Sequence, residues 1–74
     1  MLMSVTKLAE KCFAFSTASK ATKAHWMNKV LCEKGFQMKR EDKKGYEPLL
    51  KAIGYCRKME PGKLYWDDAV LEML

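Results

Sequence analysis

Positively charged side chains that could bind a polyanion gather in the middle of this 74-residue chain, which has a net charge of +5. Residues 20–44 contain eight basic residues against three acidic ones, whereas residues 67–74 contain three acidic residues and no basic one. Cations that neutralise phosphates release condensed counterions, so this clustering is typical of proteins that bind nucleic acid. An ordinary solvated basic face is the alternative, because positive charge by itself does not identify a partner.

The first part of this basic block is expected to be a helix that begins at Ser19 or Thr22, either of which can cap it. Lys34 and Gly35 are typical of its end, where a cation and a left-handed glycine are favoured. At about 100° per residue, the apolar residues 24, 27 and 31 share one side, and the polar residues point away from it. The residues that we expect to contact nucleic acid here are Lys20, Thr22, Lys23, His25, Trp26, Asn28 and Lys29.

Several side chains of this helix could read or hold a duplex. In a major groove, Lys29 can bond a guanine edge and Asn28 an adenine edge. His25 suits a phosphate contact or a plain surface position better than a metal site. Trp26 has a competing interpretation, packing sideways on the preceding helix or on the following hairpin, because large aromatic side chains bury most of their area.

A charged hairpin is expected directly after this helix. Residues 36–40 alternate like a half-buried strand, with Phe36 and Met38 facing inward. Residues 41–45 form a turn, Tyr46 starts the return strand, and Pro48 stops it, since proline cannot donate to a strand ladder. The candidates for phosphate contacts on this hairpin are Lys39, Arg40, Lys43 and Lys44, with a plain solvated turn as the alternative.

Helices and strands are expected on both sides of this block, which makes the fold class α+β. Ser4 can cap a first helix whose apolar stripe falls at residues 5, 8, 9, 12 and 13 and which ends near residue 14 or 15. Beyond the hairpin we expect a short helix at 48–53 closed by Gly54, an extended segment at 55–59, a turn at 60–62 and a strand at 63–66. Asp67 then caps a last helix, onto which Trp66 can staple through Leu71.

Other kinds of chemistry find little support in the sequence. With one histidine, no glycine-rich phosphate loop and no nucleophile placed beside a base, we expect no enzyme and no small-molecule substrate. The three cysteines are widely spaced, which indicates reduced thiols in a cytoplasmic protein. A zinc site built from Cys12, Cys32, Cys56 and His25 is disfavoured, because structural zinc ligands come in closely spaced pairs. We therefore expect no metal and no cofactor, and no membrane span either, since no apolar run approaches roughly 20 residues.

A family resemblance covers roughly residues 20–74. It is carried by the segments Met27-Asn28-Lys29-Val30-Leu31, Lys34-Gly35-Phe36-Gln37, Gly45-Tyr46-Glu47-Pro48, Gly54-Tyr55 and Leu64-Tyr65-Trp66, with Val70 and Leu74 behind them. In these segments the chain resembles the small winged helix-turn-helix modules of phage and mobile-element proteins, including the C-terminal domain of phage antirepressors. The resemblance implies a single winged-helix DNA-binding domain over residues 1–74, either alone or within a longer protein. Where that family has Thr-Glu-Lys-Gly, this chain has the more apolar Leu49-Leu50-Lys51-Ala52.

These observations lead to one expected function and one alternative. The expected function is sequence-specific binding of double-stranded DNA by a transcription or replication regulator, with the second helix in the major groove and the hairpin wing on the backbone. We expect a homodimer, because one small module buries little surface on DNA, and we expect Val70, Leu71 and Leu74 to form the dimer interface. The expected location is the bacterial or infected-cell cytoplasm. The alternative is a protein–protein interaction module, antirepressor-like or a host-factor inhibitor, since a basic face can also dock an acidic partner.

Overall fold

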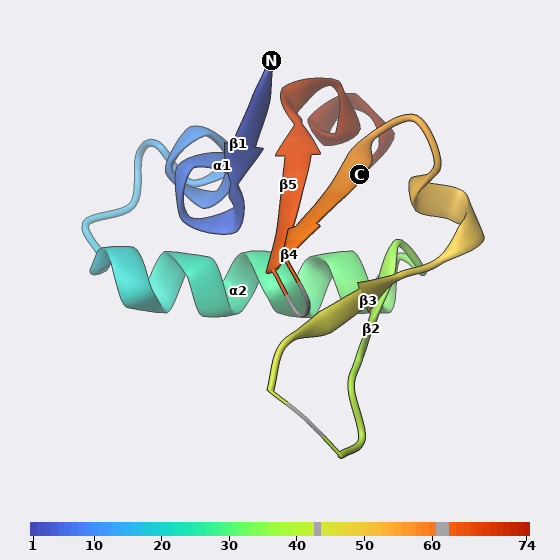
Figure 1. The fold of residues 1–74 in the computed structure, drawn as a ribbon. Helices are drawn as coiled ribbons and strands as arrows, with labels where there is room; N and C mark the ends of the chain where they lie inside the picture. Colours follow the sequence, from blue (N-terminus) through green and yellow to red (C-terminus); the bar gives the residue numbers. More distant parts are fainter. Residues whose placement is uncertain (43, 61–62) are drawn as a thin grey trace.

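A computed structural model describes residues 1–42, 44–60 and 63–74 of the chain and confirms the α+β class. The elements follow one another as β1 (Leu2–Ser4), α1 (Val5–Cys12), α2 (Lys20–Glu33), β2 (Gln37–Lys39), β3 (Tyr46–Pro48), the 3₁₀ helix η1 (Leu50–Ala52), β4 (Cys56–Glu60), β5 (Lys63–Asp67) and the 3₁₀ helix η2 (Asp68–Met73). The strands form an antiparallel sheet in the order β1-β5-β4 and a separate antiparallel hairpin, β2-β3. In Figure 1, α1 and the three-stranded sheet lie on one side of the long helix α2.

Both α-helices begin at the serines that the sequence suggests. The Ser4 hydroxyl accepts a hydrogen bond from the Lys7 backbone N–H at 3.3 Å, and Ser19 accepts one from the Thr22 N–H at 3.2 Å. Each serine thereby satisfies one of the free amides of a first helical turn. The expected caps are confirmed, with Ser19 rather than Thr22 at the start of α2.

The end of α2 turns the chain sharply into the hairpin. Gly35 adopts a φ of 83°, and its N–H bonds to the Cys32 carbonyl while the Phe36 N–H bonds to the Leu31 carbonyl at 2.9 Å. This pair of bonds is the Schellman motif, which favours glycine at the left-handed position. Phe36, which follows this turn, is completely buried. Its ring meets Trp66 edge to face, with 6.4 Å between ring centroids.

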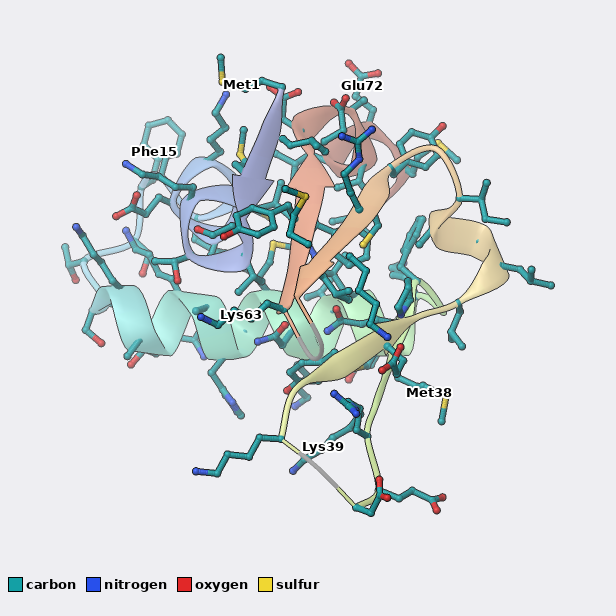
Figure 2. The ribbon with its side chains drawn as sticks, in the orientation of Figure 1. Met1, Phe15, Met38, Lys39, Lys63 and Glu72 are labelled. Carbon is teal, nitrogen blue, oxygen red and sulfur yellow. The ribbon has the colours of Figure 1, made fainter. Side chains whose placement is uncertain are left out.

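The inward side of strand β2 differs from the sequence expectation. Phe36 is buried as expected, but Met38 is 47% exposed and Gln37 only 2% exposed. Phe36 belongs to the helix cap, so the alternation of the strand itself starts at Gln37, and Met38 points to solvent (Figure 2). The Gln37 amide is accommodated because its Nε2 donates to Asn28 Oδ1 at 3.0 Å and to the Asn28 carbonyl at 3.3 Å. Buried polar groups need such partners.

The three-stranded sheet contains a strand that the sequence pattern does not indicate. Strand β1 pairs with β5, with Leu2 opposite Asp67 and Ser4 opposite Tyr65. The extended segment and the strand expected around residues 55–66 are confirmed as β4 and β5, whereas the expected turn at 60–62 includes residues 61 and 62, which lie outside the described residues. The sheet closes over α1 and α2, and Leu8, Met27 and Trp66 are fully buried between these layers.

The C-terminal segment joins this core, which corrects the expected dimer interface. Asp67 is the helix cap, as expected, but the helix that follows is a 3₁₀ helix. Val70 is fully buried in the monomer, and Leu71 and Leu74 are partly buried against the same core. Val70 therefore cannot belong to an exposed apolar seam, whereas Leu71 and Leu74 keep part of their surface open.

The segment after β3 is also shorter than expected as a helix. A single 3₁₀ turn, η1, takes the place of the helix predicted over 48–53, and Gly54 closes it with a φ of 90°. Lys51 reaches back from η1 to the end of α2, where its Nζ donates to the Lys34 carbonyl at 2.8 Å and lies 4.8 Å from the centre of the Phe36 ring. A cation at this place complements the unsatisfied carbonyls of the helix end.

Candidate nucleic-acid interface

The outward side of α2 supplies the largest group of expected contact residues. Thr22, His25 and Lys29 are exposed, whereas Met27 and Leu31 on the inner side are completely buried. The face that the apolar spacing predicts to point away from the core therefore does so. The remaining polar candidates on α2 are partly covered or paired. Lys23 and Asn28 are half-buried, and the exposed Lys20 has its Nζ 3.6 Å from Glu10 Oε1.

Trp26 packs sideways on the end of α1, as the alternative interpretation of this residue predicts. Its ring meets Phe13 edge to face, with 5.5 Å between centroids and planes 76° apart, and 38% of the residue stays exposed. Aromatic pairs prefer such edge-to-face geometry. Trp26 thus braces α1 against α2, and only its remaining exposed part is open to a ligand.

The hairpin lies on the solvent side of α2. Figure 1 shows β2 and β3 leaving the C-terminal end of α2 and extending away from α1 and the three-stranded sheet. The hydrogen bonds from Gln37 to Asn28 tie the base of the hairpin to the middle of the helix. The outward side of α2 and the hairpin, which are adjacent in sequence, are therefore adjacent on one surface as well.

Fewer basic side chains of the hairpin are free to contact phosphate than the sequence suggests. Arg40 is 15% exposed in its side chain and pairs with Glu47 at 3.4 Å between Nε and Oε1, so it is not a free phosphate contact. Lys39 and Lys44 are exposed and make no ion pair within the described part of the chain. The fourth candidate, Lys43, lies outside the described residues. Glu41 and Asp42 are exposed in the same hairpin, and their negative charges reduce its net positive charge.

The second hairpin, β4-β5, adds cations that the sequence reasoning missed. Lys58 Nζ lies 2.8 Å from Glu47 Oε2, so Glu47 on β3 pairs both with Arg40 of its own hairpin and with Lys58 on β4 of the other sheet. Arg57 is exposed, and Figure 2 shows Lys63 over α2 at the start of β5. The sequence signal was the basic residues Arg57, Lys58 and Lys63, but only the tertiary structure brings Lys63 next to the middle of α2.

A groove of about 380 Å³ lies where these parts meet. It runs between the middle of α2, the hairpin β2-β3 and the start of β5, and its walls include Asn28, Gln37, Tyr46, Lys63, Tyr65 and Trp66. Tyr46 and Tyr65 are half-buried and come from different sheets. The groove therefore combines aromatic rings with side-chain amides and an ammonium group, next to the basic face of α2.

Comparison of the chain with protein-family models, curated proteins and solved structures gave no match.

Two of the three cysteine thiols have a raised pKa in this structure. Burial raises the pKa of the Cys56 thiol to about 11 and also raises the pKa of Cys12, which keeps both thiols protonated at neutral pH. Across residues 1–42, 44–60 and 63–74, no three His, Cys, Asp or Glu side chains are grouped to hold a metal ion. Within the same ranges, no helix is both long and apolar enough to cross a bilayer.

Proposed function

We propose that this chain is a winged helix-turn-helix module of the phage and mobile-element type that binds double-stranded DNA. The outward side of α2 would enter the major groove, and the hairpin β2-β3 would follow the backbone as the wing. The supporting observation is the arrangement of these two parts: Thr22, His25 and Lys29 are exposed along α2, and the hairpin extends on that same solvent side (Figure 1).

The charges on this surface set the expected salt dependence. Lys23 and Lys29 on α2 and Lys39 and Lys44 on the hairpin form no ion pair among the described residues. If these four lysines contact phosphates, the slope of log K against log salt is about −3.6, from about −0.9 for each contact. Binding should then weaken by roughly 100-fold between 50 and 200 mM salt.

Fluorescence anisotropy on a labelled duplex, measured over that salt range, tests the proposal. Lys29→Ala should weaken binding and make the slope less steep by about one unit, because one phosphate contact is lost. Lys7→Ala is the matched control, since Lys7 is an exposed lysine on α1, away from the proposed surface. Absence of duplex binding at low salt, or equal effects of the two substitutions, would contradict the proposal.

Binding as a homodimer is a separate proposal. One module of this size contacts few base pairs, so pairing about a two-fold axis would double the contacts and the specificity. Light scattering at micromolar concentration, with and without a palindromic duplex, measures the mass directly. A monomer under both conditions would remove this part of the proposal and leave the single-module contact intact.

A second candidate function, as a protein–protein interaction module, is favoured by one observation. Leu50 and Ile53 around η1 are 85% and 72% exposed. Together with Pro48 and Cys56 they border a shallow hollow of about 200 Å³. Exposed apolar clusters of this kind often mark contact surfaces between proteins. Leu50→Ser and Ile53→Ser should leave duplex binding unchanged if the DNA proposal holds. An unaltered chain that binds no duplex at low salt would favour this second candidate.

A further inference from the structure

The groove between α2 and the two hairpins has the features of a site for a flat, hydrogen-bonding ring. Its volume of about 380 Å³ lies at the small end of the range for ligand pockets, roughly 300–1,000 Å³. Tyr46 on β3 and Tyr65 on β5 bring aromatic rings to it from two different sheets, and both residues are half-buried. Strands β3 and β5 contact each other, and both tyrosines line this one groove.

The amides of Asn28 and Gln37 provide unused hydrogen-bonding groups in this space. Gln37 uses its Nε2 to donate to Asn28 and, at 3.7 Å, to Cys32 Sγ. Within the described chain, the Gln37 Oε1 acceptor and the Asn28 Nδ2 donor make no hydrogen bond. No fully buried side-chain nitrogen or oxygen of the described residues is left without a partner, so both of these atoms keep contact with solvent. Asn28 and Gln37 are bonded to each other and both line the groove, so its wall includes two residues that carry one unused acceptor and one unused donor.

We propose that this groove binds a single nucleobase, with a preference for adenine. An acceptor and a donor on the wall of one groove complement adenine, whose N6 amino group donates and whose ring nitrogen accepts. Amide side chains also pair with adenine through one acceptor and one donor. The tyrosine rings would supply the apolar and stacking surface that unpaired bases use. Lys63, which lines the same groove, would lie near the sugar-phosphate part of the ligand. The base could come from a free nucleotide or from an unpaired position in a strand.

This inference goes beyond the duplex contact, because it concerns a different face of α2 and an unpaired base. It is tested by NMR on the ¹⁵N-labelled protein, following the side-chain amide signals of Asn28 and Gln37. The titrants are AMP, CMP, GMP and UMP, followed by a duplex with one bulged adenine and the same duplex fully paired. AMP should shift both amide signals and bind at least fivefold more tightly than CMP.

Two substitutions separate the parts of the site. Asn28→Asp keeps the acceptor for Gln37 Nε2 and removes the donor, so it should abolish the preference of AMP over CMP. Tyr46→Ala should weaken AMP and CMP to similar extents, because it removes ring contact rather than edge recognition. Lys7→Ala is the control, since Lys7 is exposed on α1 and does not line the groove.

Each outcome is decisive. Shifts with AMP alone assign the groove to a free nucleotide, and shifts only with the bulged duplex assign it to an unpaired base in a strand. Equal binding of all four nucleotides, with no effect of Asn28→Asp, would overturn the adenine preference. Amide signals that do not move with any titrant would overturn the site itself, whatever the result of the duplex titration.

Discussion

Replacing Gln37 with alanine tests the position at which strand β2 is tied to α2. Gln37 is 2% exposed, and its Nε2 donates to two oxygens of Asn28 at 3.0 and 3.3 Å. Each such bond contributes about 1 kcal/mol net, and the buried methylene removed with it contributes about 0.8 kcal/mol. Gln37→Ala should therefore lower the free energy of unfolding by about 3 kcal/mol. A chain of this length is stable by only about 4–11 kcal/mol, so the loss is large.

Urea denaturation followed by the fluorescence of the buried Trp66 measures this difference. Thermal melting should show a drop in Tm of about 12–24 °C, at roughly 4–8 °C per kcal/mol for a domain of this size. Met38→Ala is the matched control, because Met38 is the next residue of the strand and is 47% exposed; it should change stability by about 0.5 kcal/mol or less. If Met38→Ala costs as much as Gln37→Ala, the inward side of β2 is misassigned and the tie between hairpin and helix is absent.

Three further outcomes follow from the core and the titrating groups. Val70→Ala should lower the free energy of unfolding, measured by urea denaturation, by about 2–3 kcal/mol, because Val70 is fully buried. A change near zero would indicate that Val70 lies on the surface. Cys56 should react with iodoacetamide about 100-fold more slowly at pH 8 than a thiol with the ordinary pKa of 9.0, since its pKa is about 11, and the rate should rise as the pH approaches that value. Lys11→Ala should raise the pKa of Asp68 in an NMR titration, because the Lys11 hydrogen bond, followed by one involving Asp67, lowers it. The stabilisation from Asp68 is therefore present at neutral pH and lost as the pH falls through the folded-state pKa, and an unchanged pKa in the variant would contradict this assignment.

Features that depend on neighbouring residues could be predicted from the sequence. The caps at Ser4, Ser19 and Asp67 were predictable, because a short polar side chain bonds to an amide two or three residues ahead. The end of α2 at Gly35 was predictable because its left-handed conformation costs other residues free energy. The exposed face of α2 followed in the same way from the helical repeat.

The candidate site was predictable only in part. The exposure of Thr22, His25 and Lys29 follows from the spacing of apolar residues on one helix. The pairing of Arg40 with Glu47 lies within one hairpin. The pairing of Glu47 with Lys58 did not follow from the sequence, since it joins strands of two different sheets. Charge counting treats every lysine and arginine as available, whereas the fold decides which of them are neutralised by a partner.

By itself, the amino-acid sequence determined several local features: where α1 and α2 start, where α2 stops, and which side of α2 is apolar. It did not give the end of α1, expected near residue 14 or 15 but found at Cys12, or the short 3₁₀ turn in place of the helix at 48–53. Only the tertiary structure decided that β1 pairs with β5, that Gln37 rather than Met38 faces inward, and that Val70 belongs to the core. The physical reason is the distance along the chain over which each interaction acts. A cap or a helical face is set within a few residues, whereas strand pairing and burial depend on segments that meet only when the whole chain has folded.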